Sequence, residues 1–308
     1  MDTRESLEEE VLGWLDEEGD TSTVRTNVRN ALGTAHRQRL LETDWPFLLW
    51  PEPQTFALVS GQKNYALHSE YGRPLYFRNV TEDKDLVEVP FRNYEPSYTD
   101  EQFRFVLWNR SPVAAHPSSA SPLSIVSSAS GDTSASRAIN VRGMTADGMA
   151  SEAIAPNGTT PVASTNTYLP GGLIRVSKVG TWTGTMTMTS NAGAVTNLKL
   201  LAAEKARTYQ QIRMLWTPSA VDEIEYQFFR NPTSLDDDDA VPDIPFPHSG
   251  ILVWDALLLL AAYDGRIDSA RKAIWSDNQQ RMDLAMRQAF LDGQSLKAEP
   301  AQIHEIDD

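Results

Sequence analysis

Residues 174–190 read IRVSKVGTWTGTMTMTS, and this run shows the pattern that dominates the middle of the chain. Apolar and small polar residues alternate over 174–179 and again over 183–189, and Gly180 separates the two runs. Alternation with a period of two is typical of β-strands that bury one face. The stretch therefore predicts two consecutive strands joined by a glycine turn.

Similar short runs lie on both sides of this stretch. The strands expected in the middle of the chain cover residues 124–127, 137–142, 151–154, 174–179, 183–189 and 198–201. Turn residues separate them, among them Gly131-Asp132, Asp147-Gly148 and Asn157-Gly158. Many short strands with regular turns predict an all-β sandwich of about six or seven strands.

The same region differs from its flanks in charge. The chain has 308 residues, no cysteine and a net charge of −15, from 27 basic and 42 acidic residues. Residues 110–205 hold seven basic and four acidic residues, so their net charge is +3 and the remainder carries −18. We therefore predict two domains. Residues 1–109 plus 206–308 form a host domain, and residues 110–205 form a domain inserted into it.

Helical spacing predicts two helices at the start of the host domain. The first is expected to end at Gly19, and the second covers residues 22–43 and stops before Pro46. Arg37 and Arg39 lie near the end of the second helix, where the helix dipole favours cations. The apolar stripes are Leu7, Val11, Trp14 and Leu15 in the first helix, and Val24, Val28, Ala31, Leu32 and Ala35 in the second.

Two further helices are expected at the other end of the host domain. Residues 250–264 are apolar on almost all sides, which predicts a buried helix that ends at Gly265. Asp268 is a suitable N-cap for a last helix that reaches about residue 290. A polar linker, residues 232–247, precedes the pair, and the last 15 or so residues resemble a polar tail.

Short strands complete the host domain. The expected strands cover residues 56–58, 65–67, 75–77, 86–89, 103–108, 212–216 and 224–228. The first two flank a turn at residues 60–63 and predict a hairpin, and Pro218 lies in the turn between the last two. The predicted fold class is α+β: a helical bundle with a small β region, which carries an inserted all-β sandwich.

The sequence predicts no catalytic, cofactor-binding or metal-binding residues. The absence of cysteine excludes thiolate nucleophiles and Cys-ligated zinc. The five histidines, none of them spaced as a local metal-binding pair, are His36, His68, His116, His248 and His304. No nucleophile elbow or Walker A sequence is present, and the glycines of Pro170–Leu173 precede a strand, which favours a turn over a phosphate cradle.

Two features leave alternatives open. The run Asp236–Asp239 could bind calcium, but it lacks the glycine and glutamate of an EF-hand loop, so we favour a disordered acidic loop. Trp182 could stack on a sugar ring, although a core tryptophan is the commoner outcome. An acid pair for glycoside hydrolysis is improbable in a region with four acidic residues.

The acidic composition argues against a surface that grips nucleic-acid phosphates. Residues 1–20 hold nine acids and one arginine, the opposite of a signal peptide. The most apolar run, residues 251–262, is too short to cross a bilayer, which needs about 20 apolar residues. We therefore expect a soluble protein that does not engage a membrane.

Five short stretches of the host domain carry a resemblance. They are residues 28–32 (VRNAL), 42–47 (ETDWPF), 54–58 (QTFAL), 64–67 (NYAL) and 244–247 (IPFP). In this order the host domain resembles the head-tail adaptor, or connector, proteins of tailed bacteriophages. That family has an N-terminal helix pair, an exit that contains a tryptophan, a short β region and a C-terminal helix pair after a proline-rich approach.

The inserted domain carries a second resemblance. Residues 143–148 (GMTADG), 157–162 (NGTTPV) and 184–190 (GTMTMTS) are similar to motifs of immunoglobulin-like β domains in phage structural proteins. Together the two resemblances cover nearly the whole chain.

The resemblance implies a structural virion protein rather than an enzyme, without a cofactor. It implies a homo-oligomeric ring, typically a dodecamer, in the neck of the virion, made in the cytoplasm of the bacterial host. The implied partners are the portal protein above, a tail or stopper protein below, and double-stranded DNA that passes without specific binding. The alternatives are a tail terminator or tail-completion protein, or a carbohydrate-binding accessory module.

Overall fold

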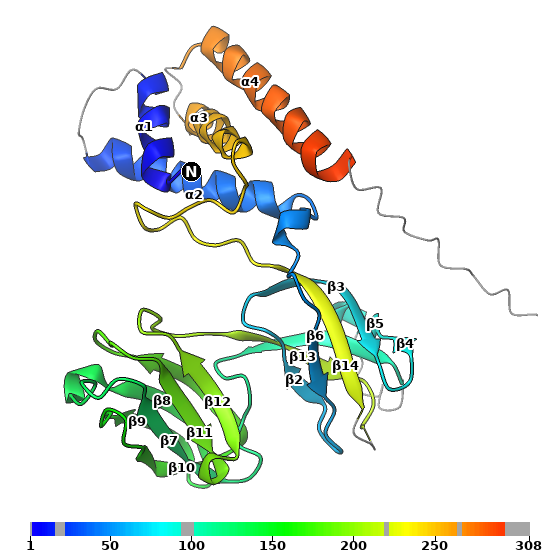
Figure 1. Cartoon of the computed structure of the whole chain (residues 1–308), viewed down its shortest axis with the longest axis vertical. Coiled ribbons are helices and arrows are strands. Elements are labelled where there is room, and N and C mark those ends of the chain that lie inside the picture. Colours follow the sequence, from blue (N-terminus) through cyan, green and yellow to red (C-terminus); the bar gives the residue numbers. More distant parts are fainter. Residues whose placement is uncertain (1, 16–21, 94–101, 219–221, 264–266, 293–308) are drawn as a thin grey trace, which may run out of the picture. The chain divides into compact units, whose positions relative to one another are not determined.

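The structure, a computed structural model, describes residues 2–15, 22–93, 102–218, 222–263 and 267–292 (Figure 1). Within these residues it has four α-helices, and 14 strands that form three sheets. The chain divides into two compact units. The helical unit comprises residues 1–50 and 229–308, and the β unit comprises residues 51–228.

The helical unit contains all four predicted helices. They are α1 (Arg4–Leu15), α2 (Ser22–Leu41), α3 (Ile251–Tyr263) and α4 (Ser269–Arg287). Buried residues from all four helices form one apolar core, which includes Leu7, Leu32, Leu252 and Trp275. Burial of this shared core is the main source of stability for the unit, because an isolated helix of this length is marginal in water.

The ends of these helices agree with the sequence only in part. Asp268 caps α4 as predicted, since its Oδ1 accepts a hydrogen bond from Arg271 N at 2.8 Å. Trp14 is 44% exposed, so its place in the buried stripe of the first helix is wrong. Its ring lies 5.0 Å from that of Trp254. Gly19 and Gly265, predicted as helix ends, lie outside the described residues, as does the predicted polar tail.

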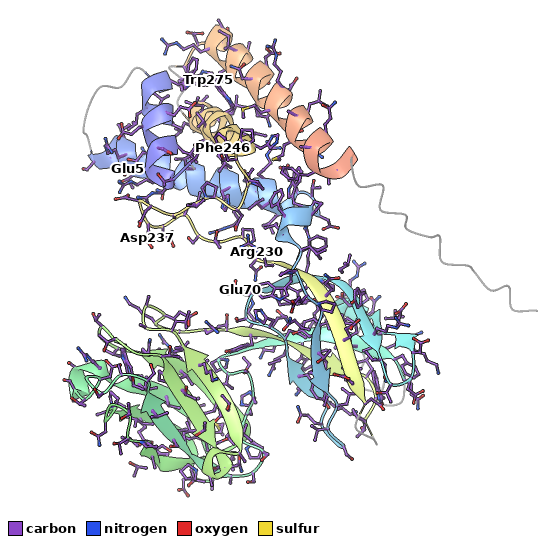
Figure 2. All side chains as sticks on the ribbon, in the orientation of Figure 1. Glu5, Glu70, Arg230, Asp237, Phe246 and Trp275 are labelled. Atoms are coloured by element: carbon purple, nitrogen blue, oxygen red, sulfur yellow. The ribbon has the colours of Figure 1, made fainter. Side chains whose placement is uncertain are left out.

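The segment before α3 is a packed part of the helical unit. Leu235 and Ile244 are buried in the shared core, and Arg4 forms an ion pair with Asp238. Asp237 and Phe246 of this segment are labelled in Figure 2. The prediction of a disordered acidic loop at Asp236–Asp239 is therefore wrong. Two buried apolar side chains anchor the segment, and arginine neutralises part of its negative charge.

Eight short strands of the β unit form two sheets of four. Sheet A has the order β1-β14-β3-β4, with bounds Gln54–Ala57, Glu223–Arg230, Tyr71–Asn79 and Lys84–Asp85. Sheet B has the order β2-β13-β6-β5, with bounds Asn64–Ala66, Tyr209–Met214, Arg104–Ser111 and Val87–Glu88. Aromatic rings from the two sheets meet: Phe77 of β3 lies 4.6 Å from Phe105 of β6, between ring centroids.

The hairpin predicted for residues 56–67 of the host domain is wrong. β1 pairs with β14 and β2 pairs with β13, so strands that follow each other in sequence lie in different sheets. The ring of Phe56 in β1 stacks on that of Tyr65 in β2, 5.1 Å away. Aromatic packing between the sheets therefore takes the place of the hydrogen bonds expected within a hairpin.

The predicted fold class is wrong as well. Sheets A and B are too extensive for the small β region of an α+β helical bundle, and with sheet C the described chain is β-rich. The strand pairs that build these sheets join residues far apart in sequence, such as Gln54 and Tyr226. Periodicity within short segments cannot reveal such pairs.

Sheet C has six strands, and each of the six runs expected in the middle of the chain contributes one. The order is β12-β11-β7-β10-β8-β9, with bounds Val195–Leu200, Met186–Ser190, Ser121–Ser127, Val162–Lys178, Ile139–Thr145 and Gly148–Ile154. Its centre is β10, whose first part pairs with β7 and whose second part pairs with β8. Residues from strands on both sides of β10, including Val141 and Met188, share one core. The limits of the inserted domain at residues 110 and 205 stay a prediction.

No described helix combines the length and the apolar character that a bilayer crossing needs.

Candidate functional site

The described residues contain no cluster of three or more His, Asp or Glu side chains that could hold a metal ion. Three of the histidines are at least half buried and have other partners. Burial lowers the pKa of His36, His68 and His116. His248 packs its ring edge-on against Phe290, and His304 lies outside the described residues.

Trp182 is buried and cannot stack on a sugar. It is 3% exposed, and its Nε1 donates a hydrogen bond to Val179 O at 3.0 Å. The Lys178 ammonium lies 5.4 Å from the centre of its ring. The segment Pro170–Leu173 lies inside β10, at a shift in its pairing register with β8.

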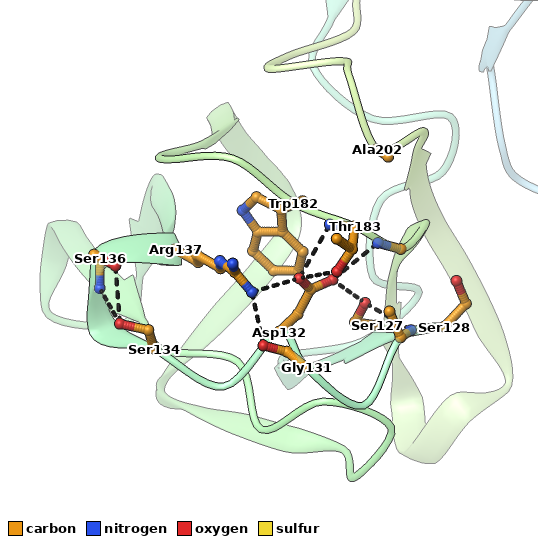
Figure 3. A network of polar contacts seen from close by, with 12 residues as sticks. Ser127, Ser128, Gly131, Asp132, Ser134, Ser136, Arg137, Trp182, Thr183 and Ala202 are labelled. Carbon is orange, nitrogen blue, oxygen red and sulfur yellow. Dashed lines mark hydrogen bonds and ion pairs between the residues drawn. The ribbon is translucent and has the colours of Figure 1, made fainter.

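A polar network that the sequence did not reveal surrounds Asp132 (Figure 3). Its carboxylate is fully buried and accepts hydrogen bonds from Ser127 Oγ at 2.6 Å and Gly184 N at 3.0 Å. Thr183 donates two more, from its backbone N at 3.1 Å and from Oγ1 at 2.9 Å. Arg137 Nη1 lies 3.0 Å from Oδ1.

These bonds explain the ionisation of Asp132. Burial alone would raise its pKa, but the hydrogen bonds from Ser127, Thr183 and Gly184 outweigh it and hold the pKa far below the usual range. With five donors around two oxygens, the carboxylate is fully occupied. The network therefore joins the loops of sheet C and leaves no room for a ligand. The sequence showed Asp132 only as a turn residue beside Gly131.

A second network joins three helices of the helical unit. Arg39 of α2 is 6% exposed and forms a bidentate pair with Asp255 of α3, with N–O distances of 3.0 and 2.6 Å. Its Nη1 also donates to Asp283 of α4 at 2.7 Å. Burial lowers the pKa of Arg39, but the bonds and charges of Asp255 and Asp283 raise it overall. We refer to Arg39, Asp255 and Asp283 as the arginine clasp.

A third polar contact holds the segment before α3 against α2. His36 Nε2 accepts a hydrogen bond from Asp243 N at 3.1 Å, and Arg230 Nη2 lies 2.5 Å from Asp243 Oδ1. Thr233 donates from its backbone N and its Oγ1 to the other carboxylate oxygen. These contacts fix the path of the chain as it leaves β14 at Arg230, which Figure 2 labels.

Between α2 and this segment lies a groove of about 600 Å³. One face of α2 lines it, from Thr26 to Arg37, and residues 232–236 line the other side. Arg29 is occupied by Glu8 at 2.8 Å, whereas Arg37 is exposed and makes no hydrogen bond or ion pair within the described part of the chain. The groove is polar, and the hydroxyl of Thr233 in its lining donates to Asp243 at 2.8 Å.

A shallower groove, of about 480 Å³, lies on sheet C. It is lined by side chains of β8, β9 and β10, including Arg142, Arg175 and Glu152. The two arginines face each other from adjacent strands. Charge patterns at the level of single segments did not reveal this pair, because 33 positions separate its members in the sequence.

Comparisons with known proteins add no relative. No protein-family model matches the chain, and no curated protein matches it.

Proposed function

We propose that the protein is a structural component of a bacteriophage neck, a head-to-tail adaptor. In this proposal many copies form a ring, a dodecamer in the adaptor family, beneath the portal protein. Double-stranded DNA passes through the ring, and a tail or stopper protein binds below it. The proposal rests on the resemblance of five stretches of the sequence to adaptor proteins, and on one structural observation about charge.

That observation is where the acidic residues lie. The helical unit has 12 basic and 26 acidic residues, a net charge of −14. The β unit has 15 basic and 16 acidic residues, a net charge of −1. Almost the entire net negative charge therefore belongs to the helical unit, which combines helices from the N-terminal and C-terminal parts of the chain. An acidic wall repels DNA phosphates, so DNA could move past it without being held.

The arginine clasp supports the proposal in a second way. A ring subunit between a capsid and a tail must keep its shape under load, and buried ion pairs with good geometry fix the relative placement of helices. Arg39 connects α2 of the N-terminal pair to α3 and α4 of the C-terminal pair.

Electron microscopy of the purified protein with portal rings from the same virus tests the proposal. The expected result is a ring of density bound directly beneath the portal, with a copy number set by native mass spectrometry. A protein that stays monomeric with portal rings present, and that adds no density below them, contradicts it. In a map of the whole virion, density at an end of the tail tube would instead identify a tail terminator.

A further inference from the structure

One outer face of sheet C presents a regular array of polar side chains. Strand register aligns Ser177, Asn140 and Ala153 in one row across β10, β8 and β9. A second row aligns Arg175, Arg142 and Ser151. Adjacent strands lie about 4.8 Å apart, so each row spans roughly 10 Å. We refer to Asn140, Arg142, Ser151, Arg175 and Ser177 as the arginine face.

The two arginines of this face lie directly opposite each other. Like charges in register on neighbouring strands destabilise a sheet. Both side chains are exposed, and neither forms a hydrogen bond or ion pair with any described residue. Among the described residues, therefore, no ion pair offsets the repulsion between Arg142 and Arg175. Such a pair is understandable if an external anion lies between the two guanidinium groups.

The groove at this face also offers unused neutral donors. The side chains of Asn140, Ser151 and Ser177 line it and make no hydrogen bond within the described residues. Glu152, the one acidic residue in the lining, is engaged elsewhere. It accepts hydrogen bonds from Thr165 N at 2.6 Å and from Asn166 N at 3.0 Å. These bonds lower its pKa despite its burial, and its carboxylate forms no ion pair with either arginine among the described contacts.

We propose that the arginine face binds an acidic saccharide. Arg142 and Arg175 would hold one carboxylate or sulfate group between them, since guanidinium groups bind such oxyanions in a bidentate manner. Asn140, Ser151 and Ser177 would bind hydroxyl groups on either side of it. The proposal adds a binding activity to the β unit and does not depend on the proposed place of the protein in a virion.

The lining favours a saccharide over an acidic protein surface. Protein interfaces concentrate their binding energy in aromatic and other large apolar anchors at their centre. The groove has no aromatic residue in its lining, and Val141 is its single large apolar member. Its volume of about 480 Å³ lies in the range of small-ligand sites. Hydroxyl and amide groups beside a paired cation match the hydroxyl-rich neighbourhood of a sugar acid.

Calorimetric titration of the full-length protein tests this proposal. The probes are a hexamer of galacturonic acid, a heparin hexasaccharide, the neutral hexamer of galactose and a hexapeptide of glutamate. We expect the two acidic saccharides to bind and the neutral one not to. Binding should weaken as sodium chloride rises from about 50 to about 200 mM, because charge supplies much of the affinity.

Reversing the charge of either arginine tests whether the pair binds a ligand or only stabilises the sheet. Arg142→Glu and Arg175→Glu should each weaken saccharide binding by about tenfold or more, because one charge-assisted contact becomes a repulsion. Each also places an acid opposite the remaining arginine, so the melting temperature should stay the same or rise by about 1–4 °C. Lys199→Glu makes the same change of charge on β12, at an exposed residue outside the groove, and should bind like the unaltered protein.

Three outcomes would overturn the proposal. The first is an equal loss of binding in Lys199→Glu, which would mean that net charge alone attracts the probes. The second is tighter binding of the glutamate hexapeptide than of either saccharide, which would point to an acidic protein partner. The third is no binding of either acidic saccharide. Ring assembly beneath a portal is unaffected by these results, so failure here leaves the proposed function standing.

Discussion

Asp132 shows how one side chain can make the stability of the β unit depend on pH. Its pKa in the folded state lies far below the value of about 3.9 expected in an unfolded chain. A group with a depressed folded pKa contributes stability that is complete above its unfolded pKa. That contribution is lost as the pH falls below about 4, toward the folded pKa.

We predict that Asp132→Asn destabilises sheet C by about 2–4 kcal/mol at pH 7, because an amide cannot accept all of these hydrogen bonds. The loss should shrink below about pH 4, where the unaltered protein also loses the benefit of the ionised carboxylate. Chemical denaturation of both proteins between about pH 2.5 and 7 measures this difference. A stability difference that does not change with pH would contradict the assignment.

The arginine clasp makes a second prediction about single residues. Arg39→Met should destabilise the helical unit by about 3 kcal/mol, because Asp255 loses its cation and Asp283 keeps only Arg287, whose Nε lies 2.8 Å away. Arg37→Met, two residues away on α2, is the matched control. Arg37 is exposed, so its replacement should change stability by less than about 0.5 kcal/mol. Urea denaturation, monitored by the circular dichroism signal of the helices, compares the two variants. Equal losses of stability would contradict the structural role of the arginine clasp.

Arg39 and Arg37 also show that the sequence alone does not reveal which of two neighbouring residues is buried. Arg39 and Arg37 both fit the expectation of a cation near a helix end, yet one is buried and the other exposed. Their difference depends on Asp255 and Asp283, more than 200 residues away. Trp182 likewise lies in the loop between β10 and β11, and its neighbours in the sequence cannot show that the core of sheet C buries it.

At the level of secondary structure elements, two glycines differ in the space available for a larger side chain. Gly33 lies inside α2, and a Cβ built there meets no atom within 4 Å. Gly184 lies beside the Asp132 network, where a Cβ would stand 2.5 Å from Ala129 N and 2.6 Å from Ser127 Oγ. The same substitution should therefore have opposite effects at the two positions.

Gly33→Ala should stabilise the helical unit by about 0.5–1 kcal/mol, because alanine restricts the unfolded chain and favours a helix. Gly184→Ala should destabilise the β unit by at least about 2 kcal/mol, because backbone and hydroxyl atoms must move. Differential scanning calorimetry of the two variants tests both. A loss of stability in Gly33→Ala would show that the open groove above α2 is not empty in solution.

Element types proved more predictable than element partners. All four helices were predicted, because apolar stripes and an N-cap such as Asp268 are local signals. The six runs of sheet C were predicted for the same reason. Strand β4 has two residues, too few for any periodicity, and β1 and β2 lie in different sheets despite the turn between them.

At the scale of the whole molecule, the uneven charge should make salt act differently on the two units. The helical unit carries −14 and repels itself, whereas the β unit is almost neutral. Raising sodium chloride from about 50 to about 500 mM shortens the screening length and weakens that repulsion. We predict greater protection from hydrogen exchange in α2 at high salt, and little change in β10, which serves as the internal control. Equal changes in both would contradict this.

The overall fold was the hardest feature to predict, because it depends on residues that meet across most of the chain. The sequence assigned a net charge of −18 to the predicted host domain and +3 to the predicted inserted domain. The two compact units of the structure, residues 1–50 with 229–308 and residues 51–228, carry −14 and −1. The candidate sites were hard to predict for the same reason, because their residues meet only in the folded chain. Asp132, Arg39 and the Arg142–Arg175 pair each depend on a partner that only the folded chain supplies.

The shared core of the helical unit has a consequence for synthesis on the ribosome. α1 and α2 emerge early, but the apolar residues of α3 that cover them follow only after the β unit. At roughly 5–20 residues per second this delay is on the order of 10–40 s. During this time the apolar side chains of Leu7 and Leu32 in the nascent N-terminal helices stay exposed, and chaperones and proteases can reach these helices. Ribosome-arrested chains that end near residue 228 should therefore be cleaved within α1 or α2 by a trace of protease, and released full-length chains should not.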